Sequence, residues 1–462
     1  LLHVVDAAGT GTLLKRLHEV VVSLSNQGDL PKAAVKLVPY VGESIYELVY
    51  GNDLEKLIRF LDAQSEARQQ EILTQLQLLK EVESNLGPVI VFGSGNAEHY
   101  LLLEEGASGT PHGIPIGEKT PVSTREFFGG SGVNYAMRLI AANEPVLPVL
   151  SIGQDIFGRK IQQALGEAAE QANLAHYIRK FISGEAFLTP NLGTAQATVL
   201  VHEGQRTIFS QPQHNMQSFF YHALQRIRVI DSILSSTPPR AVIIGHVYSD
   251  YCQIGNIENE SLTRKIVEKY RGMCPIFLNF GRTQISRGYQ FWKDMLPHVS
   301  ALQLNLTEAR NFFGPQTRDG SLEEIIDFIQ SQEINVVITM DRFGAIGNFG
   351  DGRFGTIYAW PLIKNSEIKD PTGAGDAFIA GLTYHLKGKS SFDYDDFRSS
   401  FQIARTWAAH ACKSLGASSD CPTTTELLEF VKETGVGNAM PVESRGKPSM
   451  LQVLHLIDAG SR

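Results

Sequence analysis

Cysteine is scarce in this chain of 462 residues, and the few thiols stand in no recognisable arrangement. They lie at Cys252, Cys274, Cys412 and Cys421, with no C-x-x-C pair and no pair of histidines at metal-ligand spacing. Neither a zinc site nor a disulfide framework is therefore expected. A cytoplasmic location, where thiols stay reduced, fits this usage best.

Long apolar runs are missing as well. No uninterrupted stretch approaches the roughly 18 to 20 residues that a membrane helix needs. The charge-poor stretch 186–201 is broken by Pro190, Asn191 and Gln196. The chain is not expected to span a membrane, and residues 1–25 lack the basic segment and apolar core of a signal peptide.

An excess of positive charge is also absent. Lysine and arginine number 41 against 49 acidic residues, which gives a net charge of −8 and argues against binding to nucleic acid or to an anionic membrane surface. With 43% hydrophobic residues the composition is that of an ordinary globular protein. The length predicts two or three structural units, because one core seldom grows so large.

Residues 1–85 predict a small α-helical extension. Apolar side chains recur at helical spacing over 54–61 and again over 72–82, with charged and amide residues between them. This unit is either a cap or oligomerisation element or a docking and regulatory module. At the other end of the chain, residues 435–462 are interpreted as a C-terminal tail of unknown use.

Residues 86–434 alternate short apolar runs with helical stretches, which predicts an α/β domain with a doubly wound, mostly parallel sheet. The expected strands are Val89–Phe92, Val146–Leu150, Ala241–Ile244, Pro275–Leu278, Ala301–Leu304 and Val336–Thr339. Helices are expected over 131–142, 262–271 and 322–331. Ligands of such sheets bind at the carboxyl ends of the strands.

The most informative segment is Asp370–Asp376, which reads Asp-Pro-Thr-Gly-Ala-Gly-Asp and leads into an apolar helix start. Gly373 and Gly375 allow backbone conformations that expose successive N–H groups, and the helix adds the positive end of its dipole. A phosphate is expected there, with Asp376 placed to take a proton from an attacking hydroxyl. The alternative is a purely structural glycine turn and helix cap.

Two segments interrupt the strand and helix rhythm. Residues 104–126 and 192–210 are rich in Gly, Thr, Pro and His and show weak strand alternation. A small β lid across the site would suit them, because phosphoryl transfer needs water kept out. Plain surface hairpins are the alternative.

Two further glycine clusters offer polar groups to a ligand. In Gly93–Glu98 the third glycine of a dinucleotide fingerprint is replaced by Glu98, so a nicotinamide site is not expected. Asn96 and Glu98 suit the hydroxyl groups of a substrate instead. The cluster Gly129–Asn134 opens a helix and offers backbone N–H groups together with the Asn134 amide.

In this order the motifs resemble those of the ribokinase-like, or PfkB, carbohydrate kinases over about residues 88–432. The matching segments are Gly93–His99, Gly129–Asn134, Ser151–Gly158, Asn305–Glu308 and Asp370–Asp376. The resemblance implies transfer of the γ-phosphoryl group of ATP to a hydroxyl of a sugar or nucleoside. It also implies a homodimer as one expected assembly, since lid strands of such kinases often pair between subunits.

The resemblance further implies a role for each matching residue. Asp376 would be the base, and the backbone of Gly373, Ala374 and Gly375 would form the anion hole. The substrate-binding residues would be Asn96, Glu98, Gly129, Gly130 and Asn134. The nucleotide-binding residues would be Asn305, Thr339, Gly344 and Gly375.

Two ion sites are implied in the same way. Asn305 and Glu308 would hold Mg²⁺, mostly through water, although an Asn helix cap with Glu in the first turn is the structural alternative. Asp370 and Thr372 stand where some relatives bind a monovalent cation, and whether this chain needs K⁺ stays open.

Several positions depart from the usual family pattern. Glu98 stands for a common Asp and Asn279 for another, and Met340-Asp341 would bring bulk and negative charge near the phosphates where relatives often have a small residue and Gly. His246 could supply a different contact. The departures keep a second function open, a ligand-binding pseudokinase or regulator whose N-terminal helical unit carries the output.

Overall fold

The chain divides into two compact units, residues 1–86 and 87–462. The computed structural model describes residues 59–60, 62–65, 67–69, 87–103, 122–202, 205–211, 213, 215–234, 238–247, 250–254, 257–350, 356–359, 362–364, 367–389, 391–433 and 443–444. Most of the predicted helical extension, the first part of the predicted lid and nearly all of the predicted tail lie outside these residues. No helix in the described part is long and apolar enough to cross a bilayer.

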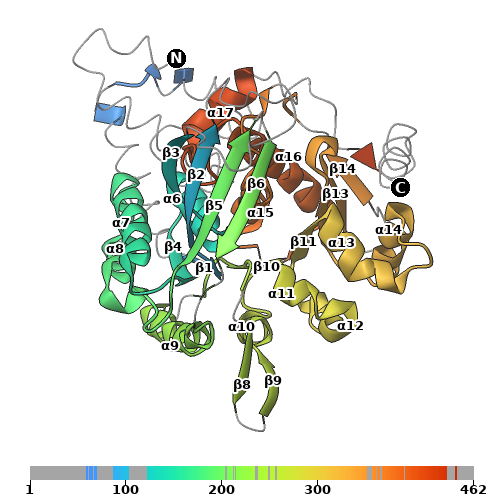
Figure 1. The fold of residues 1–462 in the computed structure, drawn as a ribbon. Coiled ribbons are helices and arrows are strands. Elements are labelled where there is room, and N and C mark those ends of the chain that lie inside the picture. The colour runs from blue at the N-terminus through green and yellow to red at the C-terminus, as the bar shows by residue number, and fades with distance from the viewer. Residues whose placement is uncertain are drawn as a thin grey trace. The chain divides into compact units, whose positions relative to one another are not determined.

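The second unit is built on a mostly parallel sheet whose strands lie in the order β15-β14-β13-β12-β11-β10-β7-β1-β4 (Figure 1). The strands from β12 to β4 are parallel, and β13, β14 and β15 add an antiparallel edge. Their bounds are β1 Val89–Ser94, β4 Val146–Ser151, β7 Ala241–Ile244, β10 Ile276–Asn279, β11 Ala301–Asn305, β12 Val336–Thr339, β13 Ala345–Asn348, β14 Thr356–Ala359 and β15 Glu443–Ser444.

All six predicted strands are present, with ends within two residues of the prediction. Each is a nearly continuous apolar run because helices and neighbouring strands cover it on both sides; all six residues of β1, for example, are buried. The α/β class and the mostly parallel sheet are therefore confirmed. Of the predicted tail, Glu443–Ser444 forms β15 and pairs with β14.

Helices flank the sheet, and α15 packs against both α6 and α16 (Figure 1). The three helices predicted from periodicity appear as α6, α10 and α14. The α-helices are α6 Ser131–Ala141, α7 Ile156–Gln171, α8 His176–Ser183, α9 Gln217–Leu234, α10 Leu262–Tyr270, α11 Arg282–Ile285, α12 Gly288–Trp292, α13 Leu306–Phe313, α14 Leu322–Ser331, α15 Ala374–Leu386, α16 Tyr394–Ala411 and α17 Thr424–Glu433.

A separate four-stranded sheet has the order β3-β2-β5-β6. Its strands are β2 Asn96–Leu103, β3 Val122–Gly129, β5 Ala195–His202 and β6 Gln205–Gln211. The predicted lid segment 192–210 supplies β5 and most of β6, whereas 104–126 contributes only the start of β3 among its described residues. The edge strand β6 exposes the apolar side chains of Ile208 and Phe209.

A small hairpin of β8 Tyr251–Ile254 and β9 Ile257–Ser261 was not predicted (Figure 1). Its base is held by the buried Asp250, whose carboxylate accepts hydrogen bonds from the Ser261 hydroxyl at 2.7 Å and from the Thr263 N–H at 2.8 Å. Those bonds also start α10, because Ser261 is its N-cap.

A buried ionic cluster lies at the amino ends of β4 and β7. The fully buried carboxylate of Glu144 has one oxygen 3.0 Å from Lys387 Nζ and the other 3.4 Å from Arg240 Nη1. Lys387 Nζ also donates to the Tyr384 carbonyl at 2.7 Å. These residues follow α6, precede β7 and end α15, so the cluster ties three elements together at the edge of the sheet away from the strands' carboxyl ends.

Candidate active site

Asp376 lies in the first turn of α15 and is held there by a residue of α6. The Asn134 Nδ2 atom donates to Asp376 Oδ2 at 2.6 Å. This bond fixes which end of the Asn134 amide faces the carboxylate. The other end, Asn134 Oδ1, is buried and has no hydrogen-bond partner among the described residues. The predicted role of Asn134 in binding a substrate would use this acceptor, and that role stays a prediction.

The glycine turn before Asp376 leaves several N–H groups open. Gly373 has φ 76°, in the left-handed region, and a Cβ there would lie 2.6 Å from the Ala417 Cβ. Both the backbone conformation and the lack of space therefore require glycine. No described residue accepts a hydrogen bond from the N–H of Gly373, Gly375 or Asp376. The Ala374 N–H, also predicted in the anion hole, donates to the Pro371 carbonyl at 3.2 Å. These open N–H groups lie at the amino-terminal end of α15, where the helix dipole favours negative charge.

The first acid of the motif, Asp370, connects the glycine turn to the four-stranded sheet. Its Oδ2 accepts from the Tyr100 hydroxyl of β2 at 2.9 Å and from the Gly416 N–H at 3.0 Å. Its Oδ1 accepts from the Thr372 N–H at 2.9 Å and from the Thr372 hydroxyl. Both carboxylate oxygens thus have protein donors, which explains the acid and Thr372 structurally. Their role in holding a monovalent cation stays a prediction.

Asp370 should stabilise the fold in a pH-dependent way. Burial alone would raise its pKa, but the hydrogen bonds from Thr372, Gly416 and Tyr100 outweigh it and hold the pKa below the ordinary 3.8. A depressed folded-state pKa means that the stabilisation is complete above the unfolded pKa and is lost as pH falls through the folded value.

We therefore expect Asp370→Asn to lower the free energy of unfolding at pH 7 by about 1.5–3 kcal/mol, the range for a lost hydrogen bond to a charged group. The difference in unfolding free energy from wild type should begin to shrink below about pH 4, where the carboxylate of the unfolded wild type takes up a proton, and should be lost as pH falls through the lower pKa of the folded state. Denaturant titrations at several pH values measure both effects, with the exposed Asp395→Asn as the control. A gap that does not depend on pH would contradict this account.

The four predicted substrate residues of the first two glycine clusters meet at the start of α6. Asn96 Nδ2 donates to Glu98 Oε1 at 2.9 Å. A Cβ on Gly129 would lie 2.3 Å from Glu98 Oε1, and one on Gly130 would lie 2.4 Å from Asn96 Oδ1. The glycines are thus required so that two acceptor side chains can lie against the backbone. Because Gly130 is the N-cap of α6, the cluster continues directly into the helix of Asn134.

The predicted metal residues Asn305 and Glu308 form a helix cap. Asn305 Oδ1 accepts from the Glu308 N–H at 2.9 Å, and Glu308 Oε2 accepts from the Asn305 N–H at 2.8 Å, a complete capping box at the start of α13. Burial raises the pKa of Glu308, the Asn305 N–H and His246 oppose the rise, and the charge of Asp376 adds to it. Glu308 is therefore within electrostatic reach of the candidate base, and its Oε1 is not used by the cap.

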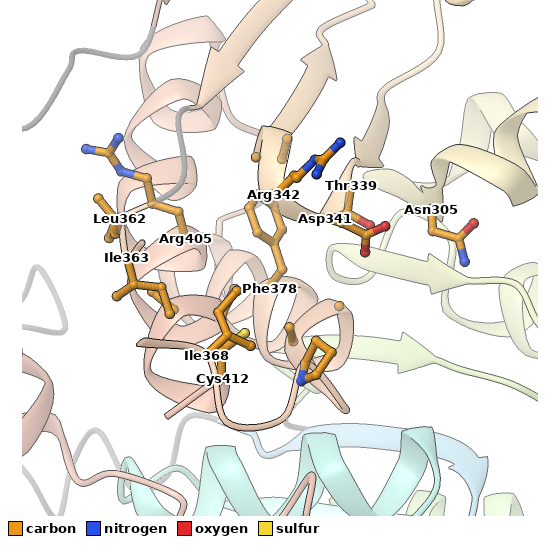
Figure 2. Close-up of a pocket in the computed structure, with 17 residues that line it drawn as sticks. Asn305, Thr339, Asp341, Arg342, Leu362, Ile363, Ile368, Phe378, Arg405 and Cys412 are labelled. Atoms are coloured by element: carbon orange, nitrogen blue, oxygen red, sulfur yellow. The ribbon is translucent and has the colours of Figure 1, made fainter. Parts of the chain in front are cut away.

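A cavity of about 280 Å³ lies between the ends of β11 and β12 and the helices α15 and α16. Its polar end carries Asn305, Thr339 and Asp341, and the opposite end is mostly apolar (Figure 2). The predicted nucleotide residues Asn305, Thr339, Gly344 and Gly375 all line it. The sequence reasoning missed most of the other lining residues: Arg342, Ala345, Leu362, Ile363, Ile368, Phe378, Arg405, Ala408, Ala409 and Cys412.

The prediction that the Met340 side chain adds bulk near the phosphates is wrong. Met340 is only 2% exposed and belongs to the hydrophobic core, because the chain turns into a short 3₁₀ helix directly after it. Asp341, by contrast, does line the cavity, and it adopts φ 47°, unusual for a residue other than glycine. Of these two residues, only the charged Asp341 lines the cavity, and the bulky Met340 does not.

Asn279 and His246, which the sequence also singled out, both have hydrogen-bond partners. Asn279 accepts from the Tyr135 hydroxyl at 3.0 Å and donates to the Gln303 carbonyl at 3.2 Å. His246 donates its backbone N–H to the Ser131 hydroxyl at 2.9 Å. Among the described residues no group of three or more His, Cys, Asp or Glu is placed to hold a metal ion.

Comparison with known proteins places this site in a family context. Residues 287–424 match the model of the pfkB family carbohydrate kinases. The chain is 24% identical to the ribokinase of Arabidopsis thaliana, over 76% of this chain and 83% of that protein. It is 22% identical to the ribokinase of Haemophilus influenzae, over 74% and 97% of the two chains.

Solved structures share the fold of the second unit. Arabidopsis thaliana ribokinase complexed with ribose and ATP superimposes with a TM-score of 0.52 at 18% identity, over 75% of this chain and 99% of that one. The Burkholderia thailandensis nucleoside kinase in complex with inosine also superimposes with a TM-score of 0.52 at 18% identity, over 75% of this chain and 99% of that one. The fold is therefore that of the ribokinase-like α/β proteins. In sequence the chain is similar to the pfkB family carbohydrate kinases over residues 287–424 and to the two ribokinases over about three-quarters of its length.

Proposed function

We propose that the protein is an ATP-dependent kinase that transfers the γ-phosphoryl group to a hydroxyl of a sugar or nucleoside. The observation that carries the proposal is the Asp376 carboxylate, held by Asn134 at 2.6 Å beside the open N–H groups at the start of α15. A base next to an anion-binding helix end is what in-line attack of an alcohol on a phosphate requires.

In the proposed reaction Asp376 accepts the proton of the acceptor hydroxyl as its oxygen attacks the γ-phosphorus. A new oxygen–phosphorus bond forms, the bond to the bridging β–γ oxygen breaks, and ADP leaves with that oxygen. The N–H groups of Gly373, Gly375 and Asp376 would bind the oxygens of the migrating group, where charge accumulates. The Ala374 N–H can join them only by leaving the Pro371 carbonyl.

The two ligands would approach Asp376 from opposite sides. Asn96, Glu98, Gly129, Gly130 and Asn134 would bind the acceptor, with Asn134 Oδ1 accepting from one of its hydroxyls. The apolar end of the 280 Å³ cavity would hold the adenine of ATP, and Asn305, Thr339, Gly344 and Gly375 would face its phosphates. The Arabidopsis ribokinase of the same fold is complexed with ribose and ATP, and the Burkholderia kinase with inosine, which supports these two classes of ligand.

The proposal includes a magnesium ion with the nucleotide. The oxygen donors near the polar end of the cavity fit a hard cation that keeps most of its waters, with Glu308 Oε1 and Asn305 as the residues that would hold those waters. The ion would neutralise charge on the phosphate oxygens. A K⁺ ion at Asp370 and Thr372, a homodimer, a cytoplasmic location and the absence of nucleic-acid binding stay predictions.

One observation favours the second function, a ligand-binding regulator. Asp341 brings a carboxylate into the cavity where the phosphates are expected, and like charges there weaken nucleotide binding, although Arg342 and Arg405 line the same cavity with the opposite charge. In that case the helical extension 1–85 would carry the output.

The two functions are separated by measuring binding and turnover on the same preparation. We expect the full chain to gain thermal stability with at least one member of a panel of pentoses, hexoses and nucleosides. With ATP and Mg²⁺ that compound should yield ADP and a phosphorylated product. Binding of an acceptor without any ADP formation would overturn the kinase and favour the regulator.

A further inference from the structure

Gln303 contacts the glycine turn from the neighbouring strand. It lies on β11, is 1% exposed, and donates from Nε2 to the Gly375 carbonyl at 2.8 Å. That carbonyl belongs to the peptide unit between Gly375 and Asp376. In a trans peptide the C=O and the N–H point in opposite directions, so holding the Gly375 oxygen also sets the direction of the Asp376 N–H.

A short chain of buried polar groups fixes Gln303 in turn. The Asn279 Nδ2 donates to the Gln303 carbonyl at 3.2 Å, and Asn279 Oδ1 accepts from the Tyr135 hydroxyl at 3.0 Å. Burial, and then the nearby charge of Asp376, raise the pKa of Tyr135 well above 10, so the phenol keeps its proton and can donate. The chain thus runs from α6 across β10 and β11 to the start of α15.

The amide of Gln303 is not fully used in this arrangement. Its Oε1 is buried and has no hydrogen-bond partner among the described residues. A buried acceptor without a partner is costly, and an apolar side chain at this position would avoid that cost. Fold stability alone therefore does not explain why this position carries a glutamine.

We propose that Gln303 is a positioning residue for phosphoryl transfer. Through the Gly375 carbonyl it holds the 375–376 peptide so that the Asp376 N–H faces the migrating group while the Asp376 side chain faces the acceptor. One side chain outside the signature motif would thus align an anion-hole donor with the base. This inference rests on the proposed kinase activity, and its central residue, Gln303, was singled out by no motif of the sequence.

The test compares Gln303→Met with wild type and with Gln163→Met. Methionine has nearly the volume of glutamine but cannot donate to the Gly375 carbonyl. Because loss of a direct oxyanion donor costs about 10²–10³ in kcat, loss of its support should lower kcat by about 10-fold or more. KM for the acceptor and for ATP should stay within about twofold. Gln163, which lies exposed on α7 and bonds to Glu167, should leave both constants unchanged.

A second variant guards against a folding defect in the first. Asn279→Leu keeps nearly the same volume but removes the side chain that donates to the Gln303 carbonyl, and it should lower kcat by a smaller factor, about threefold, in the same direction. If both variants keep kcat within twofold of wild type, or lose kcat only in proportion to folded protein, Gln303 has no positioning role.

A measurement without turnover keeps the inference separate from the proposed function. Amide hydrogen exchange of the segment 373–380 should be faster in Gln303→Met, because the first turn of α15 loses the hydrogen bond from Gln303 to the Gly375 carbonyl. Exchange in α7 should be unchanged. If wild type shows no kinase activity, the proposed function fails, and this exchange still decides whether Gln303 holds the turn. Unchanged exchange at 373–380 would overturn the inference.

Discussion

Replacing Asp376 by Asn is expected to lower kcat by about 10²–10⁴-fold, the usual contribution of a positioned general base. The amide has nearly the shape of the carboxylate but cannot accept the hydroxyl proton. Binding of acceptor and nucleotide should persist, because the open amides, the glycine clusters and the cavity are untouched. Loss in kcat with little change in KM is the pattern of a group that acts mainly in the transition state.

Three measurements make the result specific to the base. Initial rates of ADP formation give kcat, calorimetric titration of acceptor and nucleotide gives binding, and thermal unfolding shows whether the variant folds. Asp395→Asn, on the exposed first turn of α16, is the matched control and should behave as wild type. Turnover of Asp376→Asn at the wild-type rate would rule out the assigned base.

The second large effect concerns stability and arises far from the site. Glu144→Leu leaves the buried Lys387 without its carboxylate, and we expect a loss of about 3–5 kcal/mol in the free energy of unfolding. Lys387→Leu should cost a similar amount, because it leaves the buried carboxylate with only Arg240. The double variant should lose much less stability than the sum of the two single losses, because it leaves neither the Glu144 carboxylate nor the Lys387 ammonium buried without the other.

The chain offers a convenient probe for this cycle. Its three tryptophans, Trp292, Trp360 and Trp407, all belong to the second unit, so tryptophan fluorescence during denaturation follows that unit alone. Wild type, both single variants and the double variant give the coupling energy. Additive losses would mean that Glu144 and Lys387 do not stabilise each other.

The strands of the main sheet could be predicted because burial on both sides leaves an apolar run in the sequence. Strand β2 was missed, since Asn96 and Glu98 indicated a ligand turn while the same residues also begin a strand. The hairpin of β8 and β9 was missed for a similar reason, because its short polar segments lack clear alternation. Local pattern is weak wherever a strand lies at an edge or near a ligand.

The site was predictable where a motif supplies both the backbone and the side chain, as in Asp370–Asp376. Asn305 and Glu308 show where such prediction ends, because the same three-residue spacing is typical of a helix cap and of a metal site. For Met340 and Asp341, sequence cannot tell which of two consecutive side chains faces the cavity. Gln303 and the apolar lining from Leu362 to Cys412 reach the site only through the tertiary fold, so no local pattern marks them.

The hydrogen bonds at the centre of the site join distant parts of the chain. Asn134 and Asp376 are separated by 242 residues, and Tyr100 and Asp370 by 270. The stretch that matches the family model, 287–424, contains both acids but neither Asn134 nor Tyr100. A fragment limited to that stretch would therefore carry the signature without these two donors, and during synthesis the base gains its orientation from Asn134 only after most of the second unit has been made.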